Sequence, residues 1–300
     1  MLKIAWSEEY HHPLPKNHRF PMEKYSLIPE QLKYEGTVSD SNFFKPKILS
    51  EKDILAVHFD SYWEKLKNLK LSKSEQRKTG FPLSAELVRR ELIITQGTLD
   101  CAKYALKYAC AFNVAGGTHH AYRDRGEGFC LLNDVAVASQ HLLNYKILGK
   151  ILVVDLDVHQ GNGTAKIFEH EERVFTFSIH GEKNYPMKKE VSDLDIELHD
   201  GTGDREYLKA LKENLPKLID SVQPEIIFYQ SGVDILSTDK LGRLGLSKEG
   251  CRQRDKFVFE IARKNDIPIV VTMGGGYSEK ISDIVDAHAN TYRLAQEIYF

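Results

Sequence analysis

The chain has 300 residues, of which 42% are hydrophobic and 28% are charged, and this ordinary composition excludes a disordered or fibrous protein. Its 41 basic and 43 acidic residues nearly cancel, so the charge gives no support to nucleic acid as a partner. No stretch approaches the roughly 20 apolar residues of a membrane span, and the first residues form no signal peptide. The four cysteines show neither CxxC spacing nor the density of a disulfide scaffold. We expect a cytoplasmic protein with one domain over residues 1–300, no membrane contact, and no sequence signal for its oligomeric state.

The first part of the chain predicts only short elements. Residues 2–6 look like a first strand. The proline-rich and histidine-rich segment 9–24 indicates an ordered loop near the rim of a cleft. Short helices are expected between residues 22 and 71, with a brief strand at 53–58.

Further along, longer helices alternate with apolar strands. Residues 84–110 are helical in pattern, with Ser84 as the N-cap, and Gly97-Thr98 is expected to divide them into two helices. Strands separated by helices indicate an α/β fold with a parallel sheet covered on both faces. The strands are expected at 112–116, 151–155, 174–179, 226–230 and 268–273, and the helices at 131–144, 205–220, 247–265 and 280–298.

Residues 151–163 hold the densest group of polar side chains. An apolar, β-branched run typical of a buried strand leads into Asp155, Asp157 and His159, and a Gly-x-Gly turn follows. Side chains at i, i+2 and i+4 of an extended chain point to one side. Because unpaired buried charge is costly, two carboxylates and an imidazole at such a strand end need a compensating cation. We predict half of a metal site here.

Three other predicted strands also end in polar or glycine-rich clusters. Ligands bind at the carboxyl ends of strands in open α/β sheets, so all four clusters should meet in one crevice. Each cluster alone would also suit a structural role, and their coincidence is what favours a site. The paired histidines are candidates for acid–base work, Asp234 for a third metal ligand, and the glycines around Gly275 for close approach of backbone to a bound substrate. The three clusters are Gly116–His120, Ser231–Asp234 and Gly274–Tyr277.

Together these motifs resemble the zinc-dependent histone deacetylase family and its bacterial acetylpolyamine and acetoin-utilisation relatives. They occur in the family's order from residue 116 to 277 and are most similar to the class IV branch and to bacterial histone deacetylase-like amidohydrolases. The resemblance implies the arginase–deacetylase fold, a mainly parallel eight-stranded sheet between helix layers. The matching motifs are Gly-Gly-Thr-His119-His120-Ala, Gly126-Glu-Gly128-Phe129-Cys130-Leu-Leu-Asn133-Asp134, Asp155-Leu-Asp157-Val-His159-Gln-Gly-Asn162-Gly, Ser-Gly-Val-Asp234 and Gly-Gly-Gly-Tyr277.

The resemblance also implies a metal and its ligands. Asp157, His159 and Asp234 would hold Zn²⁺ through O, N and O atoms, and the open fourth position is what a catalytic site requires. The family carries K⁺ near the active site as well. Its ligands here would be Asp155 and Ser178, with the backbone carbonyls of Asp157, His159 and Ile179.

Proton transfer would fall to the two histidines. One would deprotonate the water and the other would protonate the leaving amine, with no sign of which does which. Asp155 would orient His119, and Tyr277 would donate to the oxyanion. Asn162 stands where the class I branch has an Asp beside the second histidine. A neutral amide stabilises an imidazolium less than a carboxylate does, so we predict a lower pKa for His120 than for His119.

The expected activity is hydrolysis of a linear amide, and its substrate stays open. Gly128 and Phe129 would form the wall of a narrow channel with Leu241, Tyr185 would lie on a rim loop, and Gly275 would border the substrate. An acyl-lysine peptide or protein, with an acetyl or a longer group, and a small acylated amine such as an acylpolyamine are all compatible. A binuclear manganese ureohydrolase would need an Asp-x-His-x-Asp strand end, which is absent. A non-catalytic acyl-lysine binding module would be expected to lack a ligand, a histidine or the tyrosine, and all are intact.

Overall fold

The computed structural model describes residues 1–300 and contains one sheet of eight strands in the order β2-β1-β3-β8-β7-β4-β5-β6. Every neighbouring pair is parallel, so the expected eight-stranded sheet is confirmed and is parallel throughout. The strands are β1 (Lys3–Ala5), β2 (Phe43–Phe44), β3 (Cys110–Asn113), β4 (Ile151–Asp155), β5 (Val174–Gly181), β6 (Leu194–Leu198), β7 (Ile226–Gln230) and β8 (Ile269–Thr272).

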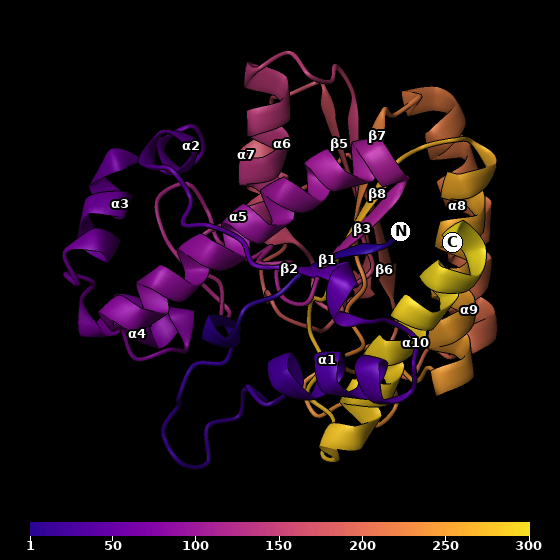
Figure 1. Ribbon diagram of the computed structural model, residues 1–300, viewed down its shortest axis with the longest axis horizontal. Coiled ribbons are helices and arrows are strands. Elements are labelled where there is room, and N and C mark those ends of the chain that lie inside the picture. The colour runs from indigo at the N-terminus through magenta and orange to yellow at the C-terminus, as the bar shows by residue number, and fades with distance from the viewer.

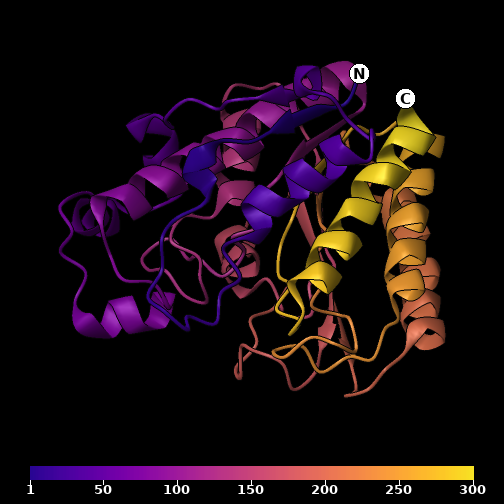
Figure 2. The same cartoon turned by 60° about the horizontal axis from the view of Figure 1, so that its bottom comes forward.

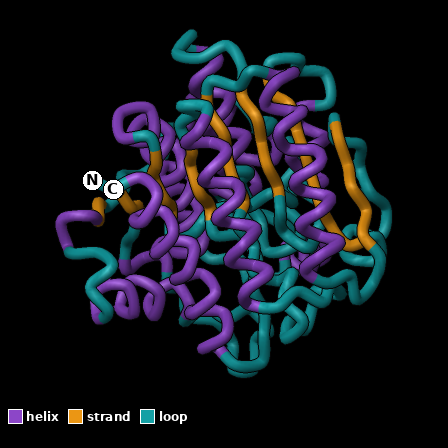
Figure 3. Tube along the Cα trace, turned by 90° about the vertical axis from the view of Figure 1, so that its right-hand side faces the viewer, coloured by secondary structure: helices purple, strands orange, loops and turns teal.

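Helices cover both faces of the sheet (Figures 1 and 3). One layer consists of α5 (Ala85–Tyr108), α6 (Asp134–Asn144) and α7 (Asn162–Phe168). The other consists of α1 (Lys24–Tyr34), α8 (Asp204–Val222), α9 (Lys248–Lys264) and α10 (Ile281–Tyr299). The short helices α2 (Glu51–Leu55), α3 (Asp60–Lys67) and α4 (Lys73–Thr79) extend to one side of the sheet, and the two chain ends lie near each other (Figure 2).

The central strands are the most buried part of the chain. Every residue of β3, β4, β7 and β8 is buried, as expected for apolar strands covered on both faces. The buried apolar side chains join into one core cluster. All four cysteines are buried and unpaired, which agrees with the absence of disulfide spacing. None of the helices combines the length and the apolar character needed to cross a bilayer.

The predicted break in the helix at 84–110 is wrong, because α5 runs unbroken from Ala85 to Tyr108. Ser84 is its N-cap, as predicted, and accepts a hydrogen bond from the Leu87 N–H. Gly97 serves packing instead of termination: a Cβ there would lie 2.5 Å from the Tyr10 hydroxyl and 3.2 Å from the Ala5 Cβ. Thr98 donates its hydroxyl to Asp134 on α6 at 2.6 Å. Contacts with other parts of the fold therefore account for Gly97 and Thr98, which the local sequence pattern assigned to a helix boundary.

Two further differences concern short elements. The segment predicted as a strand at 53–58 begins with the helix α2, which Ser50 caps by accepting from the Asp53 N–H. The strands β2 and β6 were not predicted, and they form the two edges of the sheet. β2 has only two residues, and β6 is half-exposed with acidic residues in it, so neither shows the apolar run that marks a buried strand.

Candidate metal centre and active site

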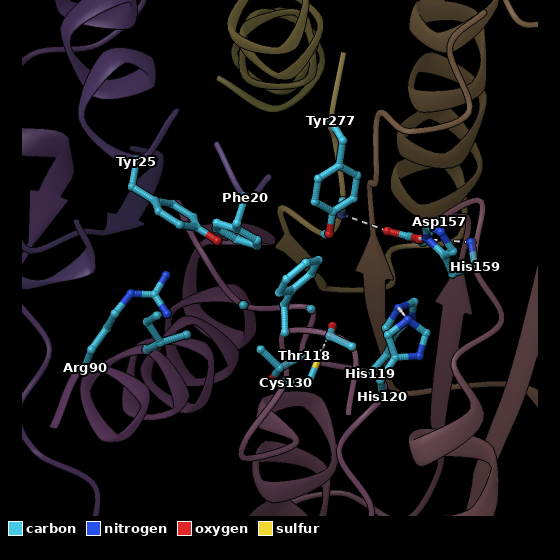
Figure 4. Close-up of a pocket in the computed structure, with 17 residues that line it drawn as sticks. Phe20, Tyr25, Arg90, Thr118, His119, His120, Cys130, Asp157, His159 and Tyr277 are labelled. Carbon is cyan, nitrogen blue, oxygen red and sulfur yellow. Dashed lines mark hydrogen bonds and ion pairs between the residues drawn. The ribbon is translucent and has the colours of Figure 1, made fainter. Parts of the chain in front are cut away.

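The four predicted clusters follow β3, β4, β7 and β8, which are adjacent in the sheet. Residues of the clusters after β3, β4 and β8 line one cavity at the carboxyl ends of these strands (Figure 4). Asp234, from the cluster after β7, does not line this cavity but contacts His159, which does. His119, His120, Asp157, His159 and Tyr277 line this cavity.

Asp157, His159 and Asp234 form the metal group, whose potential ligand atoms all lie within 4.8 Å of one another. His159 Nδ1 lies 3.0 Å from Asp157 Oδ1 and 3.1 Å from Asp234 Oδ2. Backbone N–H groups fix the remaining oxygens: Gly275 donates to Asp157 Oδ2 at 2.7 Å, and Val158 donates to Asp234 Oδ1 at 3.0 Å. An O, N, O donor set is the kind of three-ligand set that holds a catalytic zinc ion.

The electrostatics of the metal group agree with this fit. Burial would lower the pKa of His159, but hydrogen bonds to Asp157 and Asp234 outweigh it and raise this pKa to about 10. Burial, together with the charge of Asp157, raises the pKa of Asp234 to about 7. Without a cation the group therefore retains protons to reduce its buried negative charge. A divalent cation would replace those protons.

Two glycines allow this group to assemble. A Cβ on Gly275 would overlap the Asp234 carboxylate, and one on Gly232 would overlap that of Asp157. Gly275 lines the cavity, as expected of a substrate-binding residue, yet its tightest contacts are with the carboxylates of the metal group. The missing side chain thus serves the metal group more directly than the substrate.

The two histidines lie side by side with their Nε2 atoms 3.1 Å apart. His119 Nδ1 lies 2.6 Å from Asp155 Oδ2, and His120 Nδ1 lies 2.6 Å from Asn162 Oδ1. Asn162 also donates from Nδ2 to the Tyr122 hydroxyl at 2.9 Å, so its oxygen faces His120. His120 must then carry its proton on Nδ1, so its Nε2, which faces His119 Nε2, is an acceptor.

The surroundings of the two histidines shift their pKa values in the predicted order. Burial would lower the pKa of His119, but Asp155 outweighs it and raises that pKa. Burial and the adjacent His119 lower the pKa of His120 well below its usual value. The predicted cause was the neutral amide of Asn162, but its hydrogen bond acts to raise the pKa of His120, and burial and His119 are what lower it.

A carboxylate missed by the sequence interpretation holds the histidine loop in place. Asp134, the first residue of α6, accepts from the Gly117 N–H at 3.0 Å, the Thr118 N–H at 2.8 Å and the Thr118 hydroxyl at 2.7 Å. Asp134 belongs to the motif that ends Asn133-Asp134, but nothing in the spacing showed which loop it would bind.

Tyr277 lies across the cavity from the histidines, with its hydroxyl pointing inward (Figure 4). Its backbone N–H donates to Asp239 at 2.6 Å, and its ring centroid lies 6.4 Å from that of His159. Burial raises the pKa of Tyr277 well above its usual value, so the hydroxyl keeps its proton. The buried Lys24, which the sequence did not single out, donates to the Gly274 carbonyl at 3.1 Å, and its Nζ lies 5.7 Å from the centroid of the Tyr277 ring.

The cavity has an outer and an inner part. The outer part, here the mouth, has a volume of about 560 Å³ and reaches His120, His159 and Tyr277. The inner part, here the inner cavity, has a volume of about 40 Å³. The predicted substrate-binding residues Gly128 and Phe129 border both parts, while Tyr185 and Leu241 line the mouth.

The inner cavity has walls that the sequence did not predict. Phe20 comes from the loop expected at a cleft rim, and Tyr25, Arg90 and Cys130 complete this side. Arg90 donates from Nε to the Tyr10 carbonyl at 2.6 Å and pairs with Glu91, but its Nη2 has no hydrogen-bond partner. The sequence offered one sign of this wall: Arg90 and Glu91 are a charged pair among the apolar residues of a predicted helix.

The residues predicted to hold potassium lie next to each other, because Asp155 on β4 pairs in register with Ser178 on β5. The Ser178 hydroxyl lies 2.8 Å from His180 Nδ1. The metal group is the one cluster of three or more metal-ligating side chains, and it includes neither residue. The potassium site stays a prediction.

The family model of the histone deacetylase domain matches residues 18–292. The chain belongs to the histone deacetylase family. It is 38% identical over 296 residues to an uncharacterized protein of Picosynechococcus sp., with 99% of both chains covered. It is 31% identical over 284 residues to histone deacetylase 2 of Arabidopsis thaliana, with 91% of this chain and 73% of that protein covered.

A solved structure extends the likeness to three dimensions. The crystal structure of an HDAC homolog complexed with SAHA matches this chain with a TM-score of 0.84 at 26% identity. The match covers 98% of this chain and 82% of that one. The sheet and its helix layers are therefore the arginase–deacetylase fold, and membership of the histone deacetylase family supports deacetylase activity in general.

Proposed function

We propose that this histone deacetylase-family chain is a zinc-dependent hydrolase that removes an acyl group from the side-chain amine of lysine or from a similar amine. The observation that carries the proposal is the convergence of the metal group, the His119–His120 pair and Tyr277 on one cavity. Acid–base groups, a metal position and a hydroxyl donor are the parts that amide hydrolysis needs.

Asp157, His159 and Asp234 would hold the zinc ion. When bound, zinc supplies Lewis acidity that polarises the amide carbonyl and acidifies a water molecule. The N–H groups of Gly275 and Val158 orient the two carboxylates, and such outer hydrogen bonds fix ligand geometry.

The surroundings of the two histidines suit them to different proton-transfer steps. His120 is neutral and its Nε2 carries no proton, which fits a base that accepts a proton from water. His119, held by Asp155, has the higher pKa and fits an acid that donates to the leaving amine. Tyr277 keeps its proton and would donate a hydrogen bond to the carbonyl oxygen as negative charge develops there.

The inner cavity supports a short acyl group. A volume of about 40 Å³ has room for roughly three water molecules, at about 10–15 Å³ each. An acetyl group has a similar number of heavy atoms, whereas an octanoyl or myristoyl chain would require Phe20 or Tyr25 to move. We therefore expect acetyl to be preferred over longer chains.

The structure does not support the rival enzyme class, a binuclear manganese ureohydrolase. A binuclear manganese ureohydrolase would need ligands for a second ion beside the first, and the metal group stands alone. A binding module without catalysis would not need the hydrogen-bonded support that His119, His120 and Tyr277 all have.

Hydrolysis of matched fluorogenic lysine peptides carrying acetyl, octanoyl and myristoyl groups tests the proposal. Zinc-loaded wild type should release acetyl fastest and should be inhibited by a hydroxamate. Tyr277→Phe and His120→Ala should each lower kcat by about 10²–10³-fold with zinc retained. Tyr299→Phe, which loses a hydroxyl on α10 that donates to the Phe259 carbonyl, is the control and should match wild type. No release from any acyl-lysine by zinc-loaded protein would contradict the proposal.

A further inference from the structure

The mouth is the part of the site that a substrate meets first. It opens to solvent at one end and reaches His120, His159 and Tyr277 at the other. Whatever carries the acylated amine must therefore lie against its walls during the reaction.

These walls carry an excess of positive charge. Six basic side chains line the mouth, all of them exposed, and one acidic side chain, Glu127, lies among them. The chain as a whole has a formal net charge of −2, so the excess is local. The six are Arg19, Arg77, Lys78, Lys183, Lys240 and Arg243.

Most of this charge has no carboxylate partner within the protein. Arg243 pairs with Asp200 at 2.9 Å, and no carboxylate lies within 4.0 Å of the other five. Glu127 offers no compensation, because it accepts from Arg125 Nε at 2.7 Å and from the Tyr185 hydroxyl at 2.6 Å. Five cations without a carboxylate partner thus line the entrance, and one of them, Arg19, lies over the Phe129 ring at 5.0 Å.

The basic residues come from separate segments of the chain. Arg19 lies on the loop before α1, Arg77 and Lys78 are in the last turn of α4, and Lys183 follows β5. Lys240 and Arg243 lie between β7 and α9. A run of basic residues in one segment is usually just a solvated surface, whereas convergence of several segments on one opening produces a focused field.

We propose that the mouth selects substrates with negative charge around the acylated amine, and that its partner is an acyl-lysine within an acidic stretch of peptide, flanked by Asp or Glu. This inference rests on the proposed function and names its substrate class. Carboxylates beside the acyl-lysine would pair with Lys78, Lys183 or Lys240. A lysine-rich or arginine-rich peptide, and a cationic acylpolyamine, would be repelled by the same side chains.

The test compares three peptides with the same central acetyl-lysine and with acidic, uncharged or basic flanks. Zinc-loaded wild type is assayed at about 0.01 M and about 1 M salt, where the Debye length is about 30 Å and about 3 Å. At low salt, kcat/KM should fall by about tenfold from acidic to uncharged flanks and again to basic flanks, within the range of electrostatic steering. The differences should largely disappear at high salt.

Charge reversal identifies the side chains that act. In Lys78→Glu/Lys240→Glu the ratio of acidic to basic peptide should fall by at least about tenfold. Lys217→Glu, an exposed and unpaired lysine on α8 outside the mouth, is the matched control and should keep the wild-type ratio.

The outcomes separate this inference from the proposed function. If a blocked acetyl-lysine amide with no charged flanks is not hydrolysed, the proposed function fails and this inference fails with it. If all peptides are hydrolysed equally, or if the ratio of kcat/KM between the acidic and basic peptides does not change with salt, the proposed function stands and this inference is overturned. If the protein hydrolyses small acidic acylated amines but shows no preference among the three peptides, the proposal that its substrate is an acidic peptide is overturned.

Discussion

Asp157, His159 and Asp234 follow two neighbouring strands, whereas the six basic side chains of the mouth come from four segments far apart in the sequence. The metal group is buried and acidic, and the mouth is exposed and basic. The strand register fixes the first region, because β4 and β7 hold their carboxyl ends side by side. No register fixes the second, so its charge can change without disturbing the chemistry beneath it. Under the proposals above, the metal group would set the type of reaction, and the basic side chains of the mouth would set the preferred charge of the substrate.

The largest effect should come from breaking the metal group. Asp234→Asn removes one anionic ligand while keeping the shape of the side chain. Activity should fall by at least about 10³-fold, more than the loss of one oxyanion donor, and the bound zinc should fall with it. The measurement is acetyl-lysine hydrolysis together with metal content.

Asp220→Asn is the control for that substitution, since Asp220 is an exposed acid on α8. It should keep wild-type activity and zinc. If Asp234→Asn kept its zinc and turned over substrate at a similar rate, the assignment of the metal group would be wrong.

A smaller effect should come from the support behind His120. The Tyr122 hydroxyl accepts from Asn162 and donates to Glu190 Oε1 at 3.1 Å, so Tyr122→Phe leaves the amide of Asn162 free to turn. The loss of one buried hydrogen bond, about 1.4 kcal/mol, predicts about a tenfold lower kcat. KM should change little, and the pH profile of kcat should shift because His120 is less firmly held.

Tyr299→Phe is again the matched control and should leave the pH profile as in wild type. An unchanged profile in Tyr122→Phe would mean that Asn162 orients His120 without this tyrosine. In that case Asp155 and Asn162 alone would orient the two histidines.

The sequence predicted the metal group well and the walls of the site poorly. Asp157 and His159 stand in one short motif at a strand end, and Asp234 repeats that position on another strand, so alternation and topology together place all three. The side chains of Arg90 and Lys24 reach the site from helices whose orientation the sequence does not reveal. Lys78 and Lys240 resemble ordinary surface lysines until the fold brings their segments to one opening.

The edges of the fold show the same limit. Buried strands such as β4 carry apolar runs and were predicted, but β6 at the sheet edge is half-exposed and carries no such run. Gly97 was predicted to mark a helix boundary, but a side chain there would collide with Tyr10. Tyr10 is far away along the chain, so this contact leaves no local pattern in the sequence. Features set by distant contacts could not be predicted from local pattern.

The most direct test of the central claim is to remove zinc from the wild-type protein and then restore it while following acetyl-lysine hydrolysis. Activity should be lost with the metal and should return in proportion to added zinc, reaching its maximum at one ion per chain. Thermal stability should rise in parallel, by about 10 °C for a ligand at about 1,000 times its Kd, because bound zinc stabilises the buried carboxylates. Full hydrolysis by metal-free protein, or none by protein carrying one zinc ion per chain, would contradict the account.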